Sequence, residues 1–201
     1  MRKKIVLMIL ATILCALVAG SRALADALPT LTLDPPGGAL SGTLGSTVGW
    51  GFTLTNLGTD FAVITGTDFC VGAISSPCGN SLGTYADFAG AQFLVAGPAP
   101  ESNSVTQAFD NLTATGIGSF LINMGASGTV DGSIVLTYDL YKVDPNAPNF
   151  DPTTDTVSLG NELTAGASVT AVTQSVPEPG SLLLAIWGLA GCLLLKRTVF
   201  A

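Results

Sequence analysis

The chain has 201 residues and no histidine. Six of its seven Lys and Arg residues lie near the two ends, so residues 26–175 carry one basic residue, Lys142, against thirteen acids, a net charge of −12. Such a surface repels nucleic acid and anionic lipid, and the absence of histidine excludes Ser-His-Asp and Cys-His catalytic arrangements.

The N-terminus has the three parts of an export signal. Met1 is followed by the basic residues Arg2, Lys3 and Lys4, an apolar stretch runs from Ile5 to Ala19, and Ala23 and Ala25 form a small-x-small cleavage site. We therefore expect a signal peptide over residues 1–25 and a mature chain that begins at Asp26. The alternative is an N-terminal anchor that is not cleaved.

Residues 26–175 have the pattern of an all-β ectodomain. From Thr47 to Asn56, bulky apolar side chains alternate with Gly and Thr, which predicts a half-buried strand with Trp50 in the core. An exposed, sugar-stacking Trp50 is the alternative. Further strands are expected from Thr30 and over Phe61–Cys70, Tyr85–Ala96, Ser104–Phe109, Gly116–Ile122, Thr129–Val143 and Leu163–Gln174. Short strands separated by glycine turns predict an antiparallel β-sandwich of about seven to nine strands.

Cys70 and Cys78 are the two cysteines of this ectodomain. An even pair in an exported protein predicts a disulfide, because the compartment is oxidising. A redox or metal-binding pair is the alternative, although the spacing is not that of a C-x-x-C motif.

Asp and Asn gather between Asp139 and Asp155, where four Asp and two Asn fall within seventeen residues. Oxygen ligands at this density favour Ca²⁺ outside the cell. An EF-hand is excluded, because the sixth position of the loop is Asn149 instead of Gly. Two interpretations stay open. One is a surface loop whose Asp and Asn side chains bond turn backbone, and the other is a weak calcium site made by Asp144, Asn146, Asp151 and Asp155.

We expect no enzymatic activity, assign no catalytic residue and expect no cofactor beyond that calcium. A pair of facing carboxylates, as in a glycoside hydrolase, is the one catalytic arrangement that the composition leaves open. Glu101 and Glu162 are the glutamates available to it.

The C-terminus combines three features in a fixed order. Val176, Pro177, Glu178 and Pro179 come first, and the two prolines keep this segment extended and out of helices and central strands. An uncharged run, Ser181–Leu195, follows. At ~1.5 Å per residue it spans roughly 22 Å as a helix, less than the ~30 Å membrane core. Lys196 and Arg197 then act as a stop signal.

This C-terminus, residues 176–201, resembles the PEP-CTERM sorting signal, although only two basic residues close it. The resemblance implies that an exosortase, a membrane-embedded cysteine protease or transpeptidase, binds the Pro-Glu-Pro motif. The transmembrane helix 181–195 would hold the precursor in the membrane until the ectodomain is released or re-attached at the surface. An ordinary C-terminal anchor behind a proline linker is the alternative.

The family is typical of Gram-negative bacteria that make exopolysaccharide. The resemblance therefore implies an exported precursor that ends at the cell surface or in the extracellular matrix, as a structural or adhesive component of an exopolysaccharide layer. The alternative is a carbohydrate- or calcium-binding module displayed by the same route.

Overall fold

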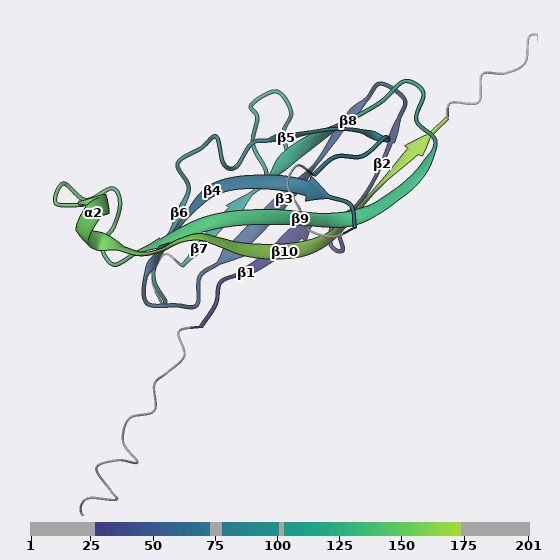
Figure 1. Cartoon of the computed structure of the whole chain (residues 1–201). Helices are drawn as coiled ribbons and strands as arrows, with labels where there is room; N and C mark the ends of the chain where they lie inside the picture. The colour runs from purple at the N-terminus through teal and green to yellow at the C-terminus, as the bar shows by residue number, and fades with distance from the viewer. Residues whose placement is uncertain (1–26, 73–77, 101–102, 174–201) are drawn as a thin grey trace, which may run out of the picture.

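The computed structural model describes residues 27–72, 78–100 and 103–173 as two β-sheets packed face to face (Figure 1). These residues form ten strands and a single helical turn, α2 (Pro152–Asp155). The prediction of an all-β sandwich is confirmed. The two expected terminal helices, over the signal peptide and residues 181–195, lie outside the described residues. Within the described part of the chain, no helix has the length and hydropathy needed to cross a membrane.

The first sheet is antiparallel throughout and has the order β1-β3-β8-β5, with β7 also paired to β3. Its strands are β1 (Thr30–Asp34), β3 (Thr47–Thr55), β5 (Gly83–Asp87), β7 (Ser104–Gln107) and β8 (Gly118–Ile122).

The second sheet has the order β2-β10-β9-β4-β6. Its strands are β2 (Ala39–Thr43), β4 (Phe61–Cys70), β6 (Val95–Ala96), β9 (Gly128–Tyr141) and β10 (Thr156–Val172). β2 pairs with β10 in parallel, so the prediction of a purely antiparallel sandwich is wrong at this edge.

The parallel pair arises because the chain changes sheets between β1 and β2. Gly38, at the end of this crossover, has a φ of 66°, and a Cβ there would lie 2.5 Å from the backbone oxygen of Gly166. Only glycine fits so close an approach. The Trp50 indole N–H donates to the Gly38 carbonyl over 2.7 Å, which fixes the crossover to the core.

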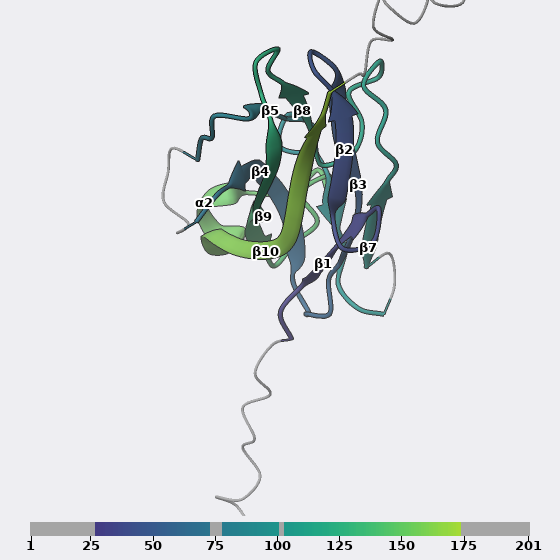
Figure 2. The same ribbon diagram turned by 90° about the vertical axis from the view of Figure 1, so that its right-hand side faces the viewer.

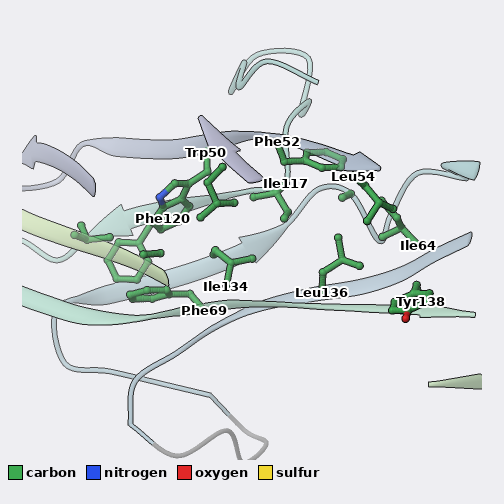
Figure 3. Close-up of a cluster of buried hydrophobic side chains, with 14 of the residues drawn as sticks. Trp50, Phe52, Leu54, Ile64, Phe69, Ile117, Phe120, Ile134, Leu136 and Tyr138 are labelled. Atoms are coloured by element: carbon green, nitrogen blue, oxygen red, sulfur yellow. The ribbon is translucent and has the colours of Figure 1, made fainter. Parts of the chain in front are cut away.

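The core fills the space between the sheets (Figure 3). Trp50 is 0% exposed, which confirms it as a core residue and excludes the sugar-stacking alternative. Its ring centroid lies 5.5 Å from that of Phe69 on the other sheet, and Phe69 meets Phe120 edge-on at 5.6 Å. Offset and edge-on aromatic contacts of this kind add to the stabilisation from buried area alone.

The strand predictions differ most from the structure at three places. The expected strand Tyr85–Ala96 is two short strands with a loop between them, and β2 was not predicted. β10 begins at Thr156 instead of Leu163, because Gly160, with a φ of 66°, makes a bulge through which the strand continues.

The described chain begins and ends at opposite ends of the sandwich, as the two views in Figures 1 and 2 agree. β10 leads from α2 at one end to Val172 at the other. At ~3.3 Å per residue, a strand of 17 residues spans roughly 55 Å.

Candidate functional site

A cleft of about 330 Å³ opens beside the disulfide and touches both sheets. Three carboxylates and two threonine hydroxyls border it. Its lining residues are Gly66, Thr67, Asp68, Cys70, Cys78, Asp87, Val135, Thr137 and Glu162.

A bulge in β4 borders the cleft at Gly66. The register between β4 and β9 shifts between Ile64 and Gly66. At this bulge the Thr137 hydroxyl donates to the Gly66 carbonyl over 3.1 Å. A Cβ on Gly66 would lie 3.0 Å from that hydroxyl oxygen, so glycine leaves room for the contact.

Asp87 joins the two sheets at the side of the cleft. Asp87 lies on β5 in the first sheet, and Thr67 lies on β4 in the second sheet. The Asp87 carboxylate accepts hydrogen bonds from the Thr67 backbone N–H at 3.1 Å and from the Thr67 hydroxyl at 2.5 Å. It also accepts from the backbone N–H of Gly90 at 2.8 Å, in the loop after β5. Three donors on one carboxylate make Asp87 a structural clamp.

Tyr85 supports the same joint. Its hydroxyl lies 2.9 Å from the Thr67 hydroxyl and 3.3 Å from the Ile117 carbonyl. Burial, more than the nearby carboxylates of Asp87 and Asp68, raises the pKa of the Tyr85 phenol far above its usual value. The phenol therefore stays protonated at physiological pH and is not available as a base.

Cys70 and Cys78 form the predicted disulfide, with their Cα atoms 4.6 Å apart. The disulfide prediction is confirmed, and the metal alternative does not apply to the oxidised pair, because neither sulfur is a thiolate. Asp68, Cys70 and Cys78 are the one group of three metal-ligand side chains within 4.8 Å of one another in the described chain. Since two of the three are oxidised, this group is not a metal centre.

The residues predicted to bind calcium hold turns in the loop between β9 and β10. Asp144 accepts from the backbone N–H of Asn146 at 2.9 Å. Asp151 caps α2 by accepting from the Thr153 hydroxyl at 2.7 Å and from the Thr153 N–H at 2.9 Å, and these two hydrogen bonds lower the pKa of the Asp151 carboxyl. Asp155 in turn accepts from the Asp151 N–H at 2.9 Å. Every one of these carboxylates has a backbone donor, and calcium binding here stays a prediction.

Of the two glutamates considered for catalysis, Glu162 lines the cleft and Glu101 lies outside the described residues. The cleft carboxylates Asp68 and Asp87 were not predicted as a group with Glu162. These three carboxylates come from three different strands, and no local motif links them.

The residues of the two signals also lie outside the described part of the chain. They are Ala23, Ala25 and Asp26 at the N-terminus, and Val176, Pro177, Glu178, Pro179, Lys196 and Arg197 at the C-terminus. Their roles stay predictions.

No protein-family model matches the chain, and no curated protein matches it. Solved structures with a similar arrangement include a nucleoside hydrolase-related protein from Saccharophagus degradans associated with carbohydrate metabolism (17% identity, TM-score 0.30). That match covers 75% of this chain and 26% of the other, so the chain spans about a quarter of that protein.

Two cohesins are also similar. The seventh ScaB type I cohesin of Pseudobacteroides cellulosolvens has 13% identity and a TM-score of 0.29, over 75% of this chain and 96% of the cohesin. The sixth cohesin of scaffoldin B from Acetivibrio cellulolyticus has 14% identity and a TM-score of 0.26, over 73% and 100%. Similarities at this level assign neither a family nor a function to the chain.

Proposed function

We propose that the chain is the precursor of an exported surface or matrix protein that an exosortase processes at Val176–Pro179. One observation carries the proposal: residues with the pattern of an export signal at one end, and residues that resemble the three-part sorting signal at the other, occur in the same chain. The β-sandwich between them would serve as a structural or adhesive component of an exopolysaccharide layer.

The properties of the domain support export. The Cys70–Cys78 disulfide suits an oxidising compartment. A net charge of −12 over residues 26–175 favours solubility outside the cell and repels nucleic acid. The Pro-Glu-Pro motif follows the last residue of β10, Val172, after only four residues. A helix at 181–195 would thus hold the motif between the membrane and the folded domain.

The test is expression of the full chain in a host with and without the matching exosortase, followed by intact mass. With the enzyme, we expect a product that begins at Asp26 and lacks Leu182–Leu195. Pro177→Ala with Pro179→Ala should keep the tail, because the rigid motif is lost, whereas Pro148→Ala in the domain should be processed normally. A native chain that keeps the tail beside an active exosortase would contradict the proposal and leave an ordinary anchor.

A second candidate is a displayed module that binds calcium, either in the acidic loop or at the cleft beside the disulfide. Asp68 and Glu162 border this cleft, while the loop prediction places calcium at Asp144 and Asp151. Calorimetry with Ca²⁺ on Asp68→Asn with Glu162→Gln, and on Asp144→Asn with Asp151→Asn, separates the two sites. Loss of binding in only one pair locates the ion, and the absence of heat and of a melting shift in the unmodified protein would exclude a calcium function.

A further inference from the structure

The outward face at one end of the first sheet carries a regular set of hydroxyls. β1, β3 and β7 each present two hydroxyl residues separated by one apolar residue. The apolar residues Leu31, Leu54 and Val105 turn inward, where Leu54 is 0% exposed and the other two pack against the core. The hydroxyl residues turn outward, because side chains alternate between the faces of a strand. They are Thr30, Thr32, Thr53, Thr55, Ser104 and Thr106.

The strand registers place these six residues in two rows, which we call the hydroxyl grid. One row is Thr30–Thr55–Ser104, and the other is Thr32–Thr53–Thr106. Since β3 has two edges, β1 lies on one side of it and β7 on the other. The rows repeat at the spacing of strands, about 4.8 Å, and at about 6.7 Å along each strand.

The grid keeps free hydrogen-bonding capacity. The hydroxyls of Thr53 and Thr106 lie 2.9 Å apart, and Ser104 donates to the Thr55 hydroxyl at 3.2 Å. A hydroxyl has one donor and two acceptor sites, so each of these contacts leaves acceptor sites facing outward. Thr30, Thr32, Ser104 and Thr106 are exposed, and the two central threonines are half-buried.

A hollow of about 250 Å³ borders the grid next to the Thr32–Thr53–Thr106 row. Gly51 of β3 comes just before the lining residues Phe52 and Thr53 and has no room for a side chain, because a Cβ there would lie 2.8 Å from the Gln107 carbonyl oxygen. Asp34 and Ala108 complete the wall of the hollow. Clefts for drug-sized ligands hold ~300–1,000 Å³, so this hollow fits a smaller group, such as one ring of a longer molecule.

We propose that the hydroxyl grid and its hollow bind a neutral polysaccharide. The grid has no charged side chain, and Asp34 at its border would accept a hydrogen bond from a sugar hydroxyl. A polyanion is disfavoured by the net charge of −12, which leaves a neutral polymer rich in hydroxyl groups as the partner that fits. The inference rests on the matrix role proposed above and names its ligand.

Cross-strand threonine pairs also stabilise sheets without any ligand, and the second sheet provides such a pair for comparison. The hydroxyls of Thr129 and Thr170 lie 2.8 Å apart on β9 and β10, and neither residue lines the hollow beside the grid. Thr129→Val with Thr170→Val is therefore the matched control for Thr32→Val with Thr106→Val. Ala108→Leu, which fills the hollow, is a second variant that leaves every hydroxyl in place.

The test is native affinity electrophoresis of the full chain, produced with its own signals in a secreting host. Separate gels contain a mixed-linkage β-glucan, a galactomannan, an α-mannan or the polyanion alginate. We expect at least one neutral polymer, and not alginate, to slow migration. Each lost hydroxyl should weaken binding by about twofold to tenfold, the range of typical net hydrogen bonds. The grid variant and Ala108→Leu should lose retardation at unchanged melting temperature, while the control pair keeps it.

Three outcomes would overturn the inference: no retardation by any neutral polymer, retardation by alginate alone, or equal loss of retardation in the control pair. Intact mass of the same preparations reports processing separately. Normal processing without glycan binding would therefore refute the proposed glycan site at the hydroxyl grid and would not affect the sorting proposal.

Discussion

Asp87 joins the two sheets at the cleft, and its replacement tests whether this joint stabilises the fold. Asp87→Ala removes the acceptor for the backbone N–H groups of Thr67 and Gly90 and for the Thr67 hydroxyl. An unsatisfied buried donor costs about 1–3 kcal/mol. Since these groups are only partly buried, we expect a loss of about 2–4 kcal/mol in the free energy of unfolding.

The assay is thermal unfolding followed by circular dichroism, with urea unfolding as a second measure. For a domain of this size, 1 kcal/mol corresponds to about 2–4 °C in Tm, so Asp87→Ala, at about 2–4 kcal/mol, should lower Tm by roughly 4–16 °C. Asp131→Ala is the matched control, because Asp131 is an exposed strand residue. Its effect should stay within about 0.5 kcal/mol.

A double-mutant cycle with Thr67→Val separates this pair from general damage. If the two side chains act as one joint, the double variant should be less destabilised than the sum of the single variants, with a coupling of about 0.5–3 kcal/mol. Additive effects, or an Asp87→Ala loss no larger than that of Asp131→Ala, would refute the assignment of Asp87 as the clamp.

Three further predictions concern the disulfide, the buried phenol and the crossover glycine. Reduction of Cys70–Cys78 should cost about 2–3 kcal/mol by loop-closure entropy, and dithiothreitol should shift the Tm of the unmodified protein but not that of Cys70→Ser with Cys78→Ser. Because burial raises the folded pKa of Tyr85, its contribution is complete below the unfolded value of ~10 and is lost at higher pH. Tyr85→Phe should lessen the fall in stability above pH ~10, measured by urea unfolding. Gly38→Ala should lower stability by at least about 1–3 kcal/mol through backbone strain, whereas Gly79→Ala, where a Cβ meets nothing within 4 Å, should stay near neutral.

Alternation in the sequence was enough to place the best strands. β4 has the predicted bounds, and in β3 the bulky residues Trp50, Phe52 and Leu54 are all buried. β2 escaped prediction because its five residues, Ala39–Thr43, contain one large apolar side chain. Its partner lies in β10, more than a hundred residues away, and local patterns carry no information about such a pairing.

The candidate sites show the same division. The disulfide followed from counting the cysteines of a chain that is expected to be exported. The cleft could not be predicted from the sequence, because Asp87 bonds to Thr67 across the two sheets and Glu162 lines the cleft from β10. Density of Asp, in contrast, drew attention to Asp144 and Asp151, whose carboxylates bond the backbone of their own turns. Composition shows which side chains could bind a metal ion, but only the fold shows how many of them already accept hydrogen bonds from the protein.

The direction of the domain connects the sorting proposal with the hydroxyl grid. β2 pairs with the last residues of β10, Ser168–Val172, and β1 comes before β2 in the chain. The hydroxyl grid, which includes β1, therefore lies toward the start of β10 and away from Val172. Figures 1 and 2 place the start of β1 at the end of the sandwich opposite the end of β10. A domain held through residues just beyond Val172 would therefore carry Thr30, Thr55 and Ser104 outward, away from the surface. The same outward placement holds whether the tail is an uncut anchor or a re-attached C-terminus, because both act through the same end of β10. Proteolysis of intact cells should then cut the β9–β10 loop at 142–155 before the segment after Val172, and the reverse order would contradict this orientation.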